Sequence, residues 1–324
     1  ATLPGEENPE FHVWDADRIF NQLSECAVQA LQGLPAEQVK AVTITTFGVD
    51  GALTDAESNL LYPVISWKCP RTAEVMKHIG KYISQEELNR ISGVGAFAFN
   101  TIYKLVWLKE NRPDLLEKAH AWLFISNILA CKLTGIMATD RTMAGTSQLT
   151  DMETGDFSPL ILNRLGLRRD LFPPMVDAGE TIGLVTPEAA AGMGLPALAG
   201  VPVISAGHDT QFAIFGSGAD RDQPVLSSGT WEILMVRSTQ AHLAPEDYAD
   251  GATAEFDAEP GLLNPGLQWL GSGIIEWVKS ACFRGETYDV MDAEAEVIPP
   301  GCDGVTMVPD FLASGEGKGS ISTA

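Results

Sequence analysis

The sequence has little positive charge. Only 21 Lys and Arg residues accompany 43 Asp and Glu residues among 324, which gives a formal net charge of -22 at pH 7. So acidic a surface repels nucleic-acid phosphates and anionic lipid headgroups over most of its area. We therefore expect neither nucleic acid nor a membrane among the partners of this protein.

Cysteine is scarce as well. The five cysteines are Cys26, Cys69, Cys131, Cys282 and Cys302. Their number is odd, they are widely spaced and they include no CxxC pair, which argues against a disulfide framework and against a zinc site. This usage is typical of a reducing environment, so we expect a cytoplasmic protein without a metal site of its own.

Long hydrophobic runs are also missing. The most apolar stretch, residues 119–133 (AHAWLFISNILACKL), is interrupted by Ser126 and Asn127 and is too short to span a bilayer. It therefore predicts a buried helix. Near residue 1, no positively charged leader precedes an apolar segment, so we expect no secretion signal.

The sequence does contain an alternation of helical and strand-like segments, which is typical of an α/β architecture with partly parallel sheets. Apolar residues recur at helical spacing from Asp15, which is placed to cap the helix, to residue 31. Residues 72–134 are mostly helical by the same criterion, and residues 159–167 predict a further short helix. Residues 60–67 (LLYPVISW) predict a strand.

A first polar loop follows a predicted buried strand at residues 41–46 (AVTITT). Open α/β sheets bind ligands at such strand ends, and Asp50 in this loop could accept hydrogen bonds from substrate hydroxyls. The alternative is a turn in which Asp50 bonds its own backbone. Spacing alone does not decide between the two interpretations.

A second polar loop, residues 207–210 (GHDT), follows the short apolar strand at residues 201–205. Asp209 is well placed there to take a proton from a bound hydroxyl. The alternative is that Asp209 or Thr210 caps the helix that follows. A lone His208 is more often structural than a metal ligand.

A third loop is the tip of a hairpin predicted from residues 224–226 and 231–236. Its amides and hydroxyls, at residues 227–230 (SSGT), can converge on an anion without net positive charge. The alternative is a plain tight turn. We expect a second domain to begin near this hairpin, so that the chain divides into residues 1–220 and 221–324.

Taken in this order, the three loops resemble those of the FGGY family of carbohydrate kinases. The resemblance is carried by residues 45–53 (TTFGVDGAL), 65–72 (ISWKCPRT), 91–97 (ISGVGAF), 100–111 (NTIYKLVWLKEN), 142–148 (TMAGTSQ), 204–212 (ISAGHDTQF) and 225–238 (VLSSGTWEILMVRS). These segments span nearly the whole chain. A Walker P-loop and a GxGxxG after a strand are both lacking, so other nucleotide-binding motifs do not compete with this resemblance.

The resemblance implies an actin-like ATPase (ribonuclease H-like) fold, with sugar held mainly by a first domain and nucleotide mainly by a second. The site residues it implies are Asp209 as catalytic base, Gly48, Asp50, Phe99, His208 and Thr210 at the sugar, and Ser228, Gly229, Thr230 and Glu276 at the nucleotide. The implied cofactors are ATP and Mg²⁺. The implied acceptor is a ketose, L-fuculose first, with L-rhamnulose or another deoxyketose as the alternative.

Two departures from the family pattern bear on activity. Family members begin with a glycine-rich DxGxT hairpin and carry an adenosine-binding segment, and this sequence contains neither. We therefore expect the fold without its N-terminal hairpin and much of its second domain, and no kinase activity from residues 1–324 alone. We also expect poor solubility or self-association of residues 1–324 in isolation. A non-catalytic sugar-binding or regulatory fragment is the alternative of another class, and a homo-oligomer is one option.

Overall fold

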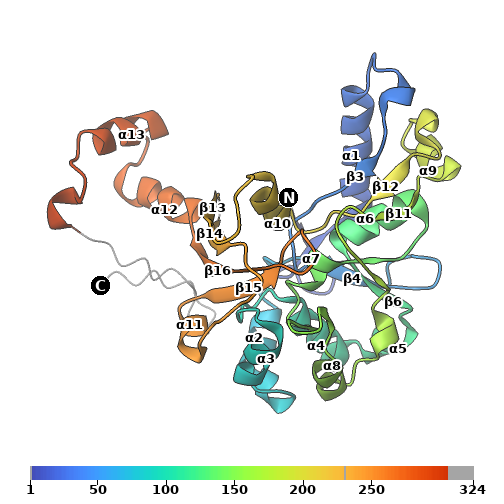
Figure 1. Ribbon diagram of the computed structural model, residues 1–324, viewed down its shortest axis with the longest axis horizontal. Coiled ribbons are helices and arrows are strands. Elements are labelled where there is room, and N and C mark those ends of the chain that lie inside the picture. Colours follow the sequence, from blue (N-terminus) through green and yellow to red (C-terminus); the bar gives the residue numbers. More distant parts are fainter. Residues whose placement is uncertain (1, 230, 306–324) are drawn as a thin grey trace.

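The computed structural model describes residues 2–229 and 231–305 (Figure 1). The α-helices are α1 (Ala16–Ala30), α2 (Thr72–His78), α3 (Gln85–Ser92), α4 (Thr101–Asn111), α5 (Pro113–Lys118), α6 (Ile125–Thr134), α7 (Arg141–Ala144), α8 (Pro159–Leu165), α9 (Pro187–Gly192), α10 (Asp209–Gly216), α11 (Pro245–Ala249), α12 (Ser272–Cys282) and α13 (Tyr288–Glu296). The strands are β1 (Leu3–Pro4), β2 (His12–Trp14), β3 (Val42–Thr43), β4 (Gly51–Thr54), β5 (Val64–Ile65), β6 (Ala121–Phe124), β7 (Thr139–Asp140), β8 (Thr150–Asp151), β9 (Asp156–Phe157), β10 (Met175–Val176), β11 (Thr181–Leu184), β12 (Pro202–Ile204), β13 (Pro224–Ser228), β14 (Trp231–Val236), β15 (Ala252–Phe256) and β16 (Leu263–Leu270). Helices and strands alternate, as the sequence predicts for an α/β protein.

The two strands that lead into the first and second loops are neighbours. β12 pairs in parallel with β3, with Val203 opposite Val42, and antiparallel with β11. A parallel bridge between Thr46 and His208 continues the pairing beyond both strands. Because parallel strands end at the same edge of a sheet, the two polar loops lie side by side there.

The predicted hairpin is confirmed by β13 and β14, which pair antiparallel from Pro224 opposite Val236 to Ser228 opposite Glu232. It belongs to a four-stranded antiparallel sheet with the order β13, β14, β16, β15. Figure 1 shows this sheet near the middle of the molecule, with α12 and α13 extending away from it. The third loop therefore lies on a different sheet from the first two.

The helix predicted from Asp15 is confirmed as α1. The Asp15 carboxylate accepts a hydrogen bond from the Arg18 amide at 2.9 Å, so it caps the first turn. Phe20 of α1 and Leu31, which follows the helix, pack on a small core formed with α6, α9 and β12. In Figure 1, α1 and α9 lie side by side beyond the sheet of β3 and β12.

The single helix predicted for residues 119–133 is wrong. Its first part is strand β6, which pairs antiparallel with β4, and α6 begins at Ile125. Trp122 and Phe124 in β6 are fully buried, and pairing with β4 supplies hydrogen bonds to a backbone that water cannot reach. Gly51 permits this pairing, because a Cβ there would lie 2.8 Å from the Trp122 ring. A continuous apolar run does not distinguish a buried strand from a buried helix, which explains the error.

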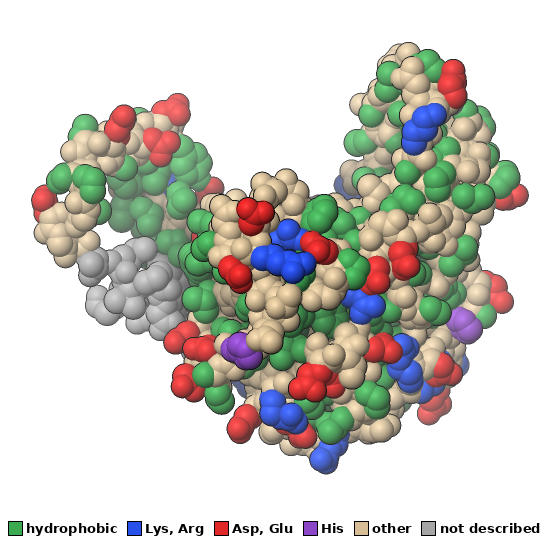
Figure 2. Space-filling view, viewed as in Figure 1, with side chains coloured by type: hydrophobic (Ala, Val, Ile, Leu, Met, Phe, Trp, Pro, Cys, Tyr) green, Lys and Arg blue, Asp and Glu red, His purple; other side chains and the backbone are tan. Residues whose placement is uncertain are grey.

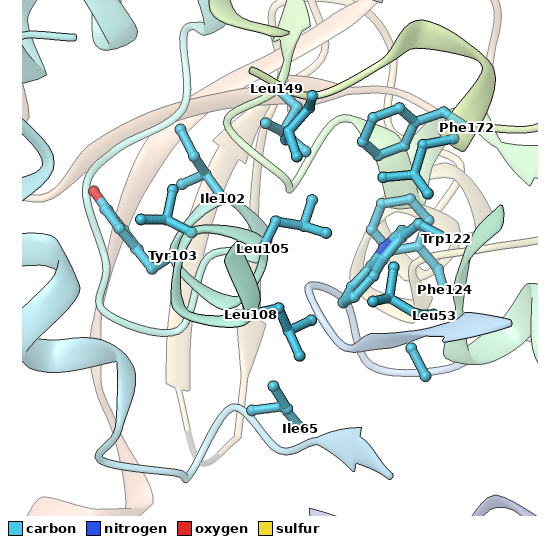
Figure 3. Packing of buried hydrophobic residues seen from close by; sticks show 14 of the residues in the cluster. Leu53, Ile65, Ile102, Tyr103, Leu105, Leu108, Trp122, Phe124, Leu149 and Phe172 are labelled. Atoms are coloured by element: carbon cyan, nitrogen blue, oxygen red, sulfur yellow. The ribbon is translucent and has the colours of Figure 1, made fainter. Parts of the chain in front are cut away.

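Helix α4 lies at the centre of the larger core. Ile102, Leu105 and Leu108 on α4 are fully buried, and Figure 3 shows Leu105 and Leu108 on the side of the helix that faces β4, β5 and β6. The same helix carries the sequence TIYKLVWLKEN, whose polar Lys104 is also fully buried. The core thus packs directly behind the loop that follows β3.

Acidic side chains are spread over the face shown in Figure 2, with Lys and Arg in small groups among them. This agrees with the excess of 43 acidic over 21 basic residues. Within residues 2–229 and 231–305, none of the helices combines the length and the apolar character that crossing a bilayer requires.

Candidate active site

A cavity of about 360 Å³ lies where the loops after β3 and β12 meet the β13–β14 hairpin. The sequence-predicted residues that line it are Gly48, Phe99, His208, Asp209, Thr210 and Gly229. Asp50, Ser228 and Glu276 lie elsewhere, and Thr230 lies outside the described residues. Residues from two different sheets therefore converge on one cavity.

Asp209 is the first residue of α10 and lies at the wall of the cavity. Its amide donates to the Thr46 carbonyl at 2.8 Å, which ties the second loop to the first. Its carboxylate is 54% exposed and accepts a hydrogen bond from the Thr210 amide at 2.8 Å. The N-cap position of α10 belongs to His208, so the Asp209 carboxylate keeps acceptor capacity for a ligand in the cavity.

His208 is held by hydrogen bonds at both its backbone and its ring. Its amide donates to the Thr142 hydroxyl at 2.9 Å, and its ring Nδ1 lies 3.1 Å from the Glu255 carboxylate on β15. Burial opposes the charged ring, but the hydrogen bond to Glu255 and the nearby carboxylates of Glu255, Asp209 and Asp140 raise the pKa of His208. The ring is thereby linked to the sheet that carries the hairpin.

A buried carboxylate, that of Asp140, packs against the second loop. Asp140 accepts hydrogen bonds from the Ser205 hydroxyl at 2.7 Å and from the Thr142 amide at 2.8 Å. Burial raises the pKa of Asp140, and these donors act in the opposite direction. The backbone of Gly207 passes so close that a Cβ there would overlap the Asp140 carboxylate and the Thr142 hydroxyl. The glycine of GHDT is therefore a steric requirement.

Gly207→Ala should destabilise the protein by about 1–3 kcal/mol, because the added methyl displaces a carboxylate that is fully committed to hydrogen bonds. Chemical denaturation measures the change. Gly216→Ala at the other end of α10 is the matched control, since a Cβ there meets no atom of the described residues within 4 Å. Equal stability of the two variants would contradict the close approach.

Asp50 lies behind the cavity, where it is fully buried. Its carboxylate accepts hydrogen bonds from the Trp14 indole at 2.6 Å and the Trp67 amide at 3.0 Å, and it forms an ion pair with Lys104 of α4. Burial raises the pKa of Asp50 and lowers the pKa of Lys104, while each charge favours the ionised form of the other. The carboxylate of Asp50 therefore does not bond the backbone of its own turn, which is one interpretation of the sequence. It also does not line the cavity, where the other interpretation places a substrate hydroxyl.

Val49 connects this ion pair to the cavity wall. Its φ of 63° places a β-branched residue in the left-handed region, which costs conformational energy. The Thr101 hydroxyl and the Lys104 ammonium both donate to its carbonyl at 2.8 Å, and its amide donates to the Thr146 hydroxyl at 3.1 Å. Three side chains thus hold the strained loop that presents Gly48 to the cavity.

Aromatic rings form much of the remaining wall. The Phe99 ring stacks on Phe97 with centroids 5.2 Å apart and meets Trp231 edge-on at 5.8 Å. Trp67 lies edge-on to Phe99 from the other side at 6.5 Å. Such a wall provides apolar surface for the C–H groups of a small ligand, while Asp209 and His208 supply polar groups.

The residues predicted to bind the nucleotide do not all lie at the cavity. Gly229 lines the cavity and its amide donates to the Trp231 carbonyl at 3.0 Å, whereas the Ser228 hydroxyl donates to Glu232 at 2.9 Å at the surface. Glu276 lies on α12 and accepts a hydrogen bond from the Tyr288 hydroxyl. It lines a separate surface groove with Lys279 and Arg284.

Sequence reasoning missed Glu255. It occurs in β15 (ATAEF) as a charged residue within an otherwise small and apolar strand, and it is 7% exposed. A charge in a buried strand is the signal that could have identified it, because buried carboxylates need partners. Its partner His208 lies 47 residues earlier, so the pairing itself has no local signature.

Known proteins resemble this chain over most of its length. Residues 4–216 match the model for the N-terminal domain of the FGGY family of carbohydrate kinases. The chain is 55% identical over 308 residues to the L-fuculokinase of Escherichia coli, which covers 95% of the chain and 65% of the relative. It is 33% identical over 248 residues to a rhamnulokinase of Bacteroides thetaiotaomicron, which covers 76% of the chain and 48% of the relative.

A solved structure shows the same fold. The ligand-bound xylulose kinase from Lactobacillus acidophilus superposes with a TM-score of 0.83 at 18% identity, covering 95% of the chain and 62% of that structure. The predicted actin-like α/β fold is thereby confirmed. The chain spans 65% of the length of the L-fuculokinase that it matches.

Proposed function

The chain belongs to the FGGY family of carbohydrate kinases, and on that premise we propose that its full-length gene product phosphorylates L-fuculose with ATP to give L-fuculose 1-phosphate and ADP. The observation that carries the proposal is the convergence of the GHDT loop and the β13–β14 hairpin on one cavity. An acceptor-binding loop and an anion-binding turn must meet in this way for direct phosphoryl transfer.

Asp209 is the proposed general base. Its exposed carboxylate accepts the proton of the sugar's primary hydroxyl as that oxygen bonds to the γ-phosphorus and the bond from phosphorus to the ADP oxygen breaks. Gly48, Phe99, His208 and Thr210 contact the sugar in this proposal, as cavity-lining residues. Asp50 is also proposed at the sugar, although its present partners are Trp14, Trp67 and Lys104.

The hairpin is the proposed phosphate site. Ser227 and Gly229 line the cavity, and hydroxyls and amides of this turn are the proposed donors to the phosphates, with Ser228 and Thr230 proposed as further contacts. Such dipoles bind phosphate without a net positive field, which suits a protein with a charge of -22. Glu276, on α12 in a separate surface groove, is also proposed to contact the nucleotide.

Mg²⁺ is proposed to arrive with the nucleotide. In proteins it is commonly held by one or two carboxylates together with substrate phosphates, and it neutralises phosphate charge. The acidic residues that line the cavity are Asp209, which is the proposed base, and Glu255, which is engaged by His208 and Gln211, so the phosphates would supply most of the ligands of such an ion. The described residues contain no group of three or more His, Cys, Asp or Glu side chains that could hold a metal by themselves.

The substrate assignment is tested by ADP release from the full-length gene product with L-fuculose, L-rhamnulose and D-xylulose. The greater identity to L-fuculokinase, 55% against 33% for rhamnulokinase, supports the highest kcat/KM for L-fuculose. A preference for L-rhamnulose would reassign the substrate. ADP release that no ketose stimulates would contradict the kinase and favour a sugar-binding or regulatory role.

A further inference from the structure

Glu255 and His208 form a polar connection between the two halves of the cavity. Glu255 lies on β15, in the sheet that carries the hairpin, whereas His208 belongs to the loop that follows β12. A single oxygen of Glu255, Oε2, accepts from the Gln211 amide group at 2.7 Å and lies 3.1 Å from Nδ1 of His208. Gln211 itself accepts a hydrogen bond from Asn264 on β16.

This arrangement determines which ring nitrogen of His208 is available to a ligand. Because Nδ1 faces the carboxylate, it carries a proton, and Nε2 is left on the other side of the ring. Nε2 lies 3.8 Å from the Asp209 carboxylate, and a Cβ at Gly48 would lie 3.1 Å from it. His208, Asp209 and Gly48 all line the cavity, so Nε2 lies between two other residues of the cavity wall.

We propose that Glu255 is a positioning residue for the sugar, which keeps the His208 ring charged and directs its Nε2–H at a substrate oxygen. This inference rests on the proposed function, because it takes the ligand of the cavity to be the ketose. The proposal gives β15 a part in sugar binding, although this strand belongs to the sheet that carries the phosphate hairpin. Occupation of the two halves of the cavity would then be coupled through one hydrogen bond.

The charges around His208 support a protonated ring. Carboxylates reach it from three elements, namely Glu255 on β15, Asp209 on α10 and Asp140 at the end of β7, and together they raise the pKa of His208 against the effect of burial. A raised pKa means that the charged donor persists to higher pH than in a free histidine and is lost as the pH rises through the folded-state value.

Glu255→Gln isolates the contribution of the charge. Since both hydrogen bonds use one oxygen, the amide oxygen of Gln can accept both, while the negative charge is removed. We expect the pKa of His208, measured by ¹H–¹⁵N NMR of its ring, to fall by about one unit or more. The Kd of L-fuculose, measured by calorimetry on the full-length gene product, should rise about tenfold at pH 8, and the increase should become smaller as the pH is lowered and the ring of the variant regains its proton.

Glu259→Gln is the matched control. Glu259 follows β15 closely and pairs with Arg237 at 2.8 Å and Arg221 at 3.3 Å, so its loss removes the same charge from the same region without touching His208. We expect its His208 titration and sugar affinity to equal those of the wild type. His208 is assigned in the spectra from the resonance that disappears in His208→Asn.

Three results would overturn the proposal: an unchanged His208 titration in Glu255→Gln, an unchanged Kd at pH 8, or a neutral His208 in the wild type at pH 6. The last measurement needs no variant, so a Glu255→Gln protein that fails to fold leaves the proposal testable. Calorimetry does not depend on turnover. Sugar binding without ADP release would therefore refute the proposed kinase function and not the role of Glu255.

Discussion

Asp209→Asn should lower the kcat of the full-length gene product with L-fuculose by about 100-fold or more. Asn keeps the size and the hydrogen bond to the Thr210 amide, but it cannot accept the proton of the attacking hydroxyl. The Kd of the sugar should change far less, because the loss falls on the transition state. Steady-state ADP release and calorimetric titration together separate the two effects.

Asp220→Asn is the control for this substitution. Asp220 is exposed and lies just beyond α10, so the variant loses the same charge outside the cavity. It should retain wild-type turnover. An Asp209→Asn enzyme with near-normal kcat would show that another group takes the proton, and the assignment of the base would be wrong.

Lys104→Met should destabilise the folded protein by about 3–5 kcal/mol, the cost of leaving a buried charge without its partner. Lys104 and Asp50 are both fully buried and form an ion pair, and Lys104 also donates to the strained Val49. Met replaces the length of the side chain but supplies no donor. Chemical denaturation at pH 7 measures the loss.

The destabilisation should depend on pH in a definite direction. Without Lys104, burial raises the pKa of Asp50 further, so the folded variant takes up a proton that the unfolded chain lacks. Its stability relative to the wild type should therefore recover as the pH falls from 8 to 5. The double variant Asp50→Asn/Lys104→Met should be less damaged than Lys104→Met at pH 8, because no buried charge remains. Equal losses for the exposed control Lys77→Met and for Lys104→Met would contradict the ion pair.

Local sequence signals were sufficient for much of the fold. The Asp15 cap with its periodic helix and the β13–β14 hairpin each depend on short segments whose chemistry is local. The strands β3 and β12 were also predicted, but their parallel pairing joins Val42 to Val203, far along the chain. The strand predicted for residues 60–67 is limited to β5, because only Val64 and Ile65 pair with β2. The strand β6 was missed because its pairing with β4 is a tertiary contact that the local sequence does not specify.

The candidate site was also predictable only in part, because its contacts join residues far apart in the sequence. Strand ends carry polar loops that the sequence marks clearly, and the resemblance to the FGGY family assigned Gly48, His208 and Asp209 to one site before the fold was known. The partners that orient them lie far along the chain: Lys104 is 54 residues from Asp50, and Glu255 is 47 residues from His208. Pairs of this separation are created by packing of the elements, which no local pattern specifies.

We propose that the cavity directs a phosphoryl group to the primary hydroxyl of a ketose next to Asp209. The most direct test is ³¹P NMR of the product that the full-length gene product forms from ATP and L-fuculose labelled with ¹³C at C1. We expect a phosphomonoester signal split by coupling to the labelled carbon, together with ADP in equal amount. A phosphomonoester without that splitting, or inorganic phosphate as the sole new product, would contradict the account.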